Sequence, residues 1–205
     1  MKEKQSVVPI YGQDFLPGYP IFTVTDNSFI SNGIIWFQNL DERIEYEKML
    51  NVEGFSHVLW VVNEHFGIEA AEHGIQFCNL EEDYFTNAHI HCVCREPIGI
   101  DDRTYAEAFN RALQLKGHGY DFPSLLGFAL SLISRASDIL PFLRKLPIPL
   151  HIPGTRVCSA FYADCMKHTQ LYRDIQLFKD YHVTRIHVHK LWNHFPFKGF
   201  RYENH

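Results

Sequence analysis

The sequence lacks an excess of basic residues, a long apolar run and an apolar stretch near its start. Lys and Arg number 19 against 24 Asp and Glu, so the formal net charge is −5 with neutral histidines. Nucleic-acid binding depends on Lys and Arg that neutralise phosphates, so we expect no nucleic-acid partner. No segment has the roughly 18 consecutive apolar residues of a membrane-spanning helix. The opening MKEKQSVVPIYGQD lacks the apolar core of a secretory signal.

Cysteine is also scarce, and its count is odd. The five cysteines are Cys78, Cys92, Cys94, Cys158 and Cys165. Without a secretory signal, we expect a cytoplasmic protein with reduced thiols. The 205 residues, of which 46% are hydrophobic, are typical of one globular domain with a substantial core. We therefore treat residues 1–205 as a single domain.

Alternation of apolar and polar residues, with β-branched and aromatic side chains, predicts the strands. The expected strands are residues 19–25, 55–62, 68–77, 88–95 and 182–189. Gly74 lies inside the third of these, and we interpret it as a kink within one strand. The early strands are close in sequence and predict an antiparallel meander.

Apolar residues at three- and four-residue spacing predict a helix over residues 101–116. Asp101 or Asp102 can cap its start and Gly117 can end it. Similar patterns predict helices over residues 125–140 and from Arg156 to His168, and a short surface helix over residues 39–51. Strands followed by helices give an α+β fold class.

Cys158 is the cysteine best placed for catalysis. It begins the helical pattern that follows Thr155, Arg156 and Val157. A helix N-terminus carries partial positive charge and free N–H groups, which favour a thiolate and could hold an oxyanion. Cys165 lies two turns further on and gains no such help. The alternative is that Cys158 is a small buried apolar residue, the usual fate of a free cysteine.

Four segments in a fixed order carry a resemblance to a known family. They are FSHVLWVV, GIEAAEHGI, GYDF and VCSAFYADC. In this order they resemble the permuted NlpC/P60 papain-like hydrolases, the YiiX-like group related to lecithin–retinol acyltransferases. In that family the strand with the histidine precedes the helix with the cysteine. The resemblance covers roughly residues 19 to 195 and implies a papain-like α+β domain, with an antiparallel strand meander packed against helices.

The chain departs from the family pattern at two places. The Gly-Asp-Ile strand start of many members is replaced here by residues 17–21, PGYPI. The segment 123–153 forms a long apolar insertion, in which Leu125, Leu126, Phe128, Leu132, Ile133 and Leu140 give residues 125–140 a broad apolar face. That face could act as a lid, an acyl-binding surface or a membrane-surface contact, or it could pack on the domain.

The resemblance also implies roles for individual residues. His57 would be the general base and acid for Cys158. Glu69 would orient the imidazole from the next strand. Glu64 and Glu72 are rivals for that role, because the hairpin register cannot be deduced from the sequence.

Tyr120 is implied more weakly. It could lie near the thiol and donate a hydrogen bond to an oxyanion or to the substrate carbonyl. It could equally be a core tyrosine.

The expected reaction is hydrolysis or acyl transfer at an amide, ester or thioester bond. A cell-wall peptide or a lipid or acyl compound would be the substrate, and the chemistry needs no cofactor. The pairs His89/His91 and His187/His189 support an alternative, because alternation puts each pair on one face of a strand. Two such pairs could hold zinc, in a metal-binding protein or a zinc-dependent hydrolase. A catalytically inactive binding domain on the same fold is a third possibility.

Overall fold

The computed structural model describes residues 15–25, 54–121 and 155–198. The expected helices over residues 39–51 and 125–140, and the insertion at 123–153 that contains the second, lie outside the described residues. The five expected strands, the expected helix over residues 101–116 and the segment 155–198 lie within the described residues.

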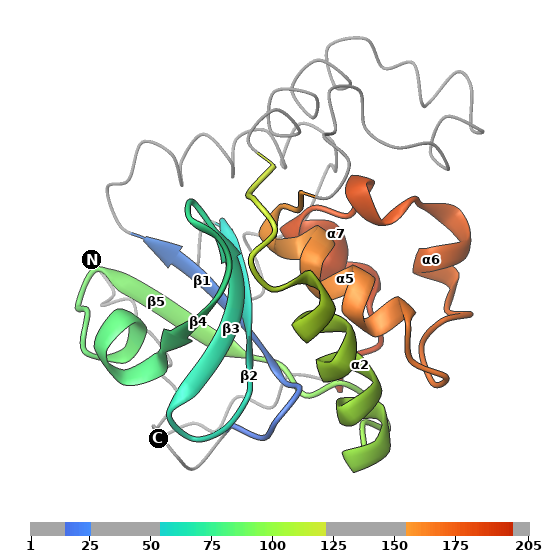
Figure 1. Cartoon of the computed structure of the whole chain (residues 1–205), viewed down its shortest axis with the longest axis horizontal. Coiled ribbons are helices and arrows are strands. Elements are labelled where there is room, and N and C mark those ends of the chain that lie inside the picture. Colours follow the sequence, from blue (N-terminus) through green and yellow to red (C-terminus); the bar gives the residue numbers. More distant parts are fainter. Residues whose placement is uncertain (1–14, 26–53, 122–154, 199–205) are drawn as a thin grey trace, which may run out of the picture.

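The described residues form a five-stranded sheet and several helices, which together give a mixed α+β architecture (Figure 1). Its strands are β1 (Pro20–Thr25), β2 (His57–Val61), β3 (Phe66–Ala71), β4 (Gly74–Asn79) and β5 (Ile90–Cys94). Their order across the sheet is β4-β3-β2-β1-β5, and each neighbouring pair is antiparallel. Three of the predicted strands are confirmed as β1, β2 and β5, within one to two residues at their ends.

The expected single strand over residues 68–77 is wrong, because the chain reverses within it. β3 and β4 form a hairpin whose turn ends at Gly74. The φ angle of Gly74 is +98°, and a Cβ at this position would lie 2.4 Å from the carbonyl oxygen of His118. Only glycine avoids both the strained φ and this overlap. Gly74 therefore marks the end of a tight turn rather than a kink.

The helix expected over residues 101–116 is confirmed as α2 (Asp102–Leu115). The side chain of Asp101 caps it by accepting the backbone N–H of Thr104 at 2.7 Å. Gly117, with φ +83°, follows its end. The helix expected from Arg156 is α5 (Cys158–Lys167), and Cys158 is its first residue.

The strand expected over residues 182–189 is wrong. The C-terminal region instead contains α6 (Gln176–Asp180), the 3₁₀ turn η4 (Val183–Arg185) and α7 (Val188–His194). The side chains of His182 and His187 accept backbone N–H groups at the starts of η4 and α7. These local hydrogen bonds favour helical turns, and they outweigh the alternating apolar pattern.

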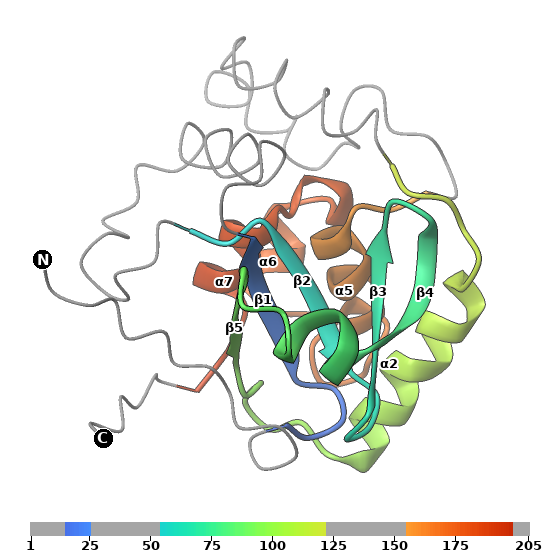
Figure 2. The same ribbon diagram turned by 90° about the vertical axis from the view of Figure 1, so that its left-hand side faces the viewer.

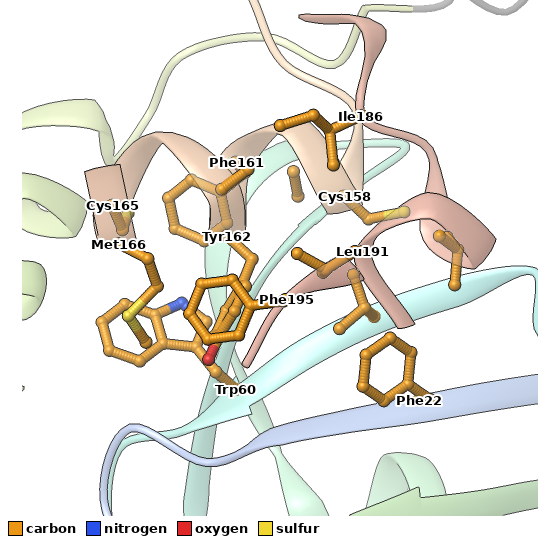
Figure 3. Packing of buried hydrophobic residues seen from close by; sticks show 14 of the residues in the cluster. Phe22, Trp60, Cys158, Phe161, Tyr162, Cys165, Met166, Ile186, Leu191 and Phe195 are labelled. Atoms are coloured by element: carbon orange, nitrogen blue, oxygen red, sulfur yellow. The ribbon is translucent and has the colours of Figure 1, made fainter. Parts of the chain in front are cut away.

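Apolar side chains cover both faces of the sheet. One face packs against α2, α5 and α7. Figure 2 shows α5 and α7 behind the strands and α2 beside β4. Figure 3 shows part of this core, with Trp60 and Phe22 of the sheet beside Phe161 and Leu191 of the helices. The other face buries Leu59 and its neighbours beneath a single turn of π-helix, η2 (Leu80–Phe85). Within the described parts of the chain, no helix combines the length and apolarity needed to cross a bilayer.

Candidate active site

The structure brings His57 and Glu69 into direct contact. His57 is the first residue of β2, and Glu69 lies near the middle of β3. The strands pair with Trp60 opposite Ile68, so His57 and Glu69 are diagonal neighbours on one face, within reach of long side chains. His57 Nε2 lies 2.7 Å from Glu69 Oε2. This hydrogen bond leaves Nδ1 as the imidazole nitrogen that can exchange a proton with a thiol.

Glu69 is a buried carboxylate with several hydrogen-bond donors. Its side chain is 6% exposed, whereas that of His57 is 21% exposed. The hydroxyl of Tyr84 donates to Oε2 at 2.5 Å, and the side chain of Gln76 also donates to the carboxylate. Burial alone would raise the pKa of Glu69, but these hydrogen bonds and the charge of His57 lower it. Glu69 therefore stays ionised beside the imidazole.

Cys158 lies at the N-terminus of α5, as Figure 3 shows. No side chain caps this end of α5, and the first intrahelical acceptor, the Val157 carbonyl, binds the N–H of Phe161. The N–H groups of Cys158, Ser159 and Ala160 precede that bond, and such groups at a helix start favour negative charge. Hydrogen bonds from the N–H groups of Ser159 and of Val58 act on the Cys158 sulfur itself.

Cys158 and His57 form a hydrogen-bonded pair whose pKa values move in opposite directions. Burial would raise the pKa of the thiol, but the charge and hydrogen bond of His57, with the two backbone N–H groups, lower it. Burial would likewise lower the pKa of His57, but the Cys158 thiolate and Glu69 raise it to about 10. Both shifts favour a thiolate–imidazolium pair, and the thiolate is the nucleophilic form of a cysteine.

Tyr120 is also close to the thiol. Residues Tyr120 and Arg156 form an isolated parallel bridge, and Arg156 lies two residues before Cys158. Burial raises the pKa of the Tyr120 phenol, and the charges of Cys158, Asp121 and Glu69 raise it further. The phenol is therefore protonated and able to donate a hydrogen bond near the sulfur.

The two rival glutamates lie away from this site. Glu64 and Glu72 have side chains that are 72% and 73% exposed, and each pairs with the histidine that follows it, His65 or His73. Of the three glutamates considered, the structure places only Glu69 against His57.

The two histidine pairs do not form the expected strand pairs. His89 lies in a turn before β5, and His187 and His189 lie at the start of α7, where a spacing of two does not put side chains on one face. The nitrogen Nε2 of His189 accepts the N–H of Phe55 at 3.3 Å. Among the described residues, no group of three or more His, Cys, Asp and Glu side chains is arranged to hold a metal.

Two residues of this constellation, Tyr84 and Gln76, were missed in the sequence. Gln76 lies on β4 directly opposite Glu69, a position hidden by the interpretation of residues 68–77 as one strand. Tyr84 follows three acidic residues in the segment LEEDYF, where no pattern indicates a π-helical turn. Comparisons with known protein families and with curated proteins found no match for this chain.

Proposed function

We propose that this protein is a cysteine-nucleophile hydrolase or acyltransferase that acts on an amide, ester or thioester bond. The proposal rests on the 2.7 Å contact between His57 Nε2 and Glu69 Oε2, together with the charge and hydrogen bond by which His57 lowers the pKa of Cys158. A nucleophile, a base within hydrogen-bond reach and a third group that orients the base are the signature of this chemistry.

The reaction begins with attack of the Cys158 sulfur on the carbonyl carbon of the substrate. A C–S bond forms, and the π electrons of the carbonyl move onto its oxygen. As this oxyanion collapses, the bond to the leaving group breaks, and His57 Nδ1 gives its proton to the departing nitrogen, oxygen or sulfur. The acyl group is then held on Cys158 as a thioester.

The second half of the reaction releases the acyl group. Water, or an amine or alcohol acceptor, attacks the thioester carbon while Nδ1 of His57 takes its proton. The C–S bond breaks, and the products are a free acid or a transferred acyl group together with the restored thiolate–imidazolium pair. Because Glu69 holds Nε2, the imidazole keeps the same orientation in both halves.

Two kinds of donor are placed to stabilise the oxyanion. The backbone N–H of Cys158 lies at the start of α5, where free N–H groups and the helix dipole favour negative charge. The hydroxyl of Tyr120 is the second candidate, since burial and neighbouring charges that include Cys158 raise its pKa and keep it a donor.

The arrangement also supports a permuted papain-like fold of the NlpC/P60 type. The strand with His57 precedes the helix with Cys158, and Glu69 follows on the neighbouring strand. The four segments of the sequence resemblance coincide with β2, the β3–β4 hairpin, the Tyr120 bridge and α5. A cell-wall peptide or a lipid or acyl compound is the substrate class that this resemblance implies.

An active ester tests the proposal without knowledge of the natural substrate. Treatment with 4-nitrophenyl acetate should release a burst of nitrophenolate and leave an acetyl thioester on Cys158, identified by mass spectrometry and removed by hydroxylamine. The Cys158→Ala variant should show no burst. The matched control is Cys94→Ala, since Cys94 is a cysteine that is less buried than Cys158. An acetyl group that maps to other side chains, or a burst that survives Cys158→Ala, would refute the proposal.

A further inference from the structure

Tyr84 contacts the candidate site from the opposite face of the sheet to α5. It belongs to the cluster that packs beneath η2, whereas Cys158 belongs to the cluster around the helices. Its hydroxyl donates to Oε2 of Glu69, the same oxygen that lies 2.7 Å from His57 Nε2. We propose that Tyr84 is a positioning residue that holds the Glu69 carboxylate ionised and in place against His57. This inference rests on the proposed cysteine chemistry.

The π-helical turn η2 positions the Tyr84 hydroxyl. Tyr84 lies in η2, and single π-helical turns are rare and frequent at functional sites. The side chain of Asn79 accepts the N–H groups of Glu81 and Glu82, and the N–H of Asn79 donates to Asp83. These hydrogen bonds hold the turn without using the phenol. The Tyr84 hydroxyl can therefore donate to Glu69.

The ring of Tyr84 is also aligned with the imidazole. The two rings are parallel within 2°, with centroids 6.4 Å apart. Glu69 Oε2 therefore accepts hydrogen bonds from two parallel rings. A carboxylate that accepts from both cannot rotate without breaking one bond, so Tyr84 limits the positions that Glu69 can take. The hydroxyl needs Glu69 as an acceptor, which favours the ionised carboxylate.

Within the described residues, the other titratable groups that interact with Glu69 or Tyr84 are neutral or already part of the site. They are His57 on β2, Cys78 on β4, Cys92 on β5 and Tyr120 after α2. Burial raises the pKa of Cys78 and Cys92, so both are neutral thiols. Among the described residues, the donors to Glu69 are thus His57, Tyr84 and Gln76.

Loss of the Tyr84 hydroxyl should therefore raise the pKa of Glu69. When Glu69 becomes protonated, the imidazolium loses its partner and the Cys158 thiolate becomes less stable. In Tyr84→Phe, thiolate reactivity should consequently be lost at a higher pH on the acid side. A shift of about one pH unit is expected from a single hydrogen bond to a charged group.

The experiment measures two quantities across pH in the full-length protein. The first is the rate of Cys158 alkylation by iodoacetamide, and the second is the pKa of the Glu69 carboxyl from its ¹³C NMR shift. Tyr84→Phe should move both upward in pH. The matched control is Tyr172→Phe, which removes another buried tyrosine hydroxyl, one that donates to the Ile98 carbonyl at 2.9 Å. This control should move neither.

A further variant shows whether Tyr84 acts through Glu69. The Glu69→Gln/Tyr84→Phe double variant should have the same pH profile of Cys158 alkylation as the Glu69→Gln single variant. If Tyr84→Phe does not fold, Asn79→Ala loosens the η2 turn and keeps the phenol. It should shift the same two quantities in the same direction by less.

Unchanged values in a folded Tyr84→Phe, or in Asn79→Ala if the first variant fails to fold, would overturn the inference. Its failure is distinct from failure of the proposed function. If Cys158 of the unmodified protein reacts no faster than an ordinary thiol, the cysteine chemistry fails. The Glu69 pKa in the variants then still decides the role of Tyr84.

Discussion

Arg156 forms a salt bridge with Asp164, with 3.2 Å between its Nη2 and Oδ2. The pair joins the segment that leads into α5 to the second turn of that helix. Arg111 of α2 reaches the same oxygen at 3.0 Å. One buried carboxylate therefore holds α2, α5 and the backbone that bridges to Tyr120, and it fixes the position at which α5 begins with Cys158.

Replacement of Asp164 by Asn should destabilise the protein strongly. Two poorly exposed guanidinium groups would lose their shared counter-charge, a change that costs about 3–5 kcal/mol in buried pairs. Urea unfolding measures the loss. The control is Asp174→Asn, which breaks an exposed pair with Arg173 and should change the free energy of unfolding by no more than about 1 kcal/mol. Equal effects of the two substitutions would contradict this account of the Asp164 site.

Gly74→Ala should destabilise more than Gly117→Ala. Both glycines have positive φ, so both variants incur strain of about 1–2 kcal/mol. A Cβ at Gly74 also meets the His118 carbonyl oxygen at 2.4 Å, whereas a Cβ at Gly117 has no neighbour within 4 Å. We expect Gly74→Ala to cost about 1–3 kcal/mol more by thermal or urea unfolding. Equal losses would show that the hairpin turn can move away from His118.

Glu69→Gln should lower the reactivity of Cys158 at neutral pH. The substitution keeps the shape of the side chain but removes the charge that helps to raise the pKa of His57. A hydrogen bond to a charged group contributes about 1.5–3 kcal/mol, or roughly 10- to 100-fold in the thiolate population. Alkylation kinetics measure the change. Glu72→Gln, at a side chain that is 73% exposed, is the control and should react like the unmodified protein.

Local sequence patterns predict those elements whose apolar periodicity matches the side chains that the fold buries. The strand positions of β1, β2 and β5 follow from alternation, and the start of α2 follows from the capping residue Asp101. Cys158 begins the helical pattern that follows Val157 in the sequence, and it is the first residue of α5.

Other features depend on contacts that are remote in the sequence. The reversal at Gly74 requires the backbone of residues 117–118, with which Ile75 exchanges hydrogen bonds. The choice of Glu69 over Glu64 and Glu72 requires the register of β2 and β3. The contribution of Tyr84 requires a π-helical turn that no periodicity predicts.

The histidine-rich segment near the C-terminus illustrates the reverse case. Its alternation predicts a strand, but His182 and His187 cap helical turns instead. The apolar residues Ile186, Val188 and Leu191 are buried in the core against the sheet. A periodic pattern of eight residues was too short to exclude this arrangement.

We infer that Cys158 and His57 form a thiolate–imidazolium pair, and the pH dependence of Cys158 alkylation reports on this pair. His57 and two backbone N–H groups lower the pKa of Cys158 below that of an ordinary thiol, and the raised pKa of His57 predicts that the imidazolium persists until about pH 10. The iodoacetamide rate at Cys158, mapped by mass spectrometry, should therefore already be high and nearly flat at neutral pH. His57→Ala should abolish this plateau. A rate that rises only around pH 8.5, as for a free thiol, and that does not depend on His57 would contradict the account.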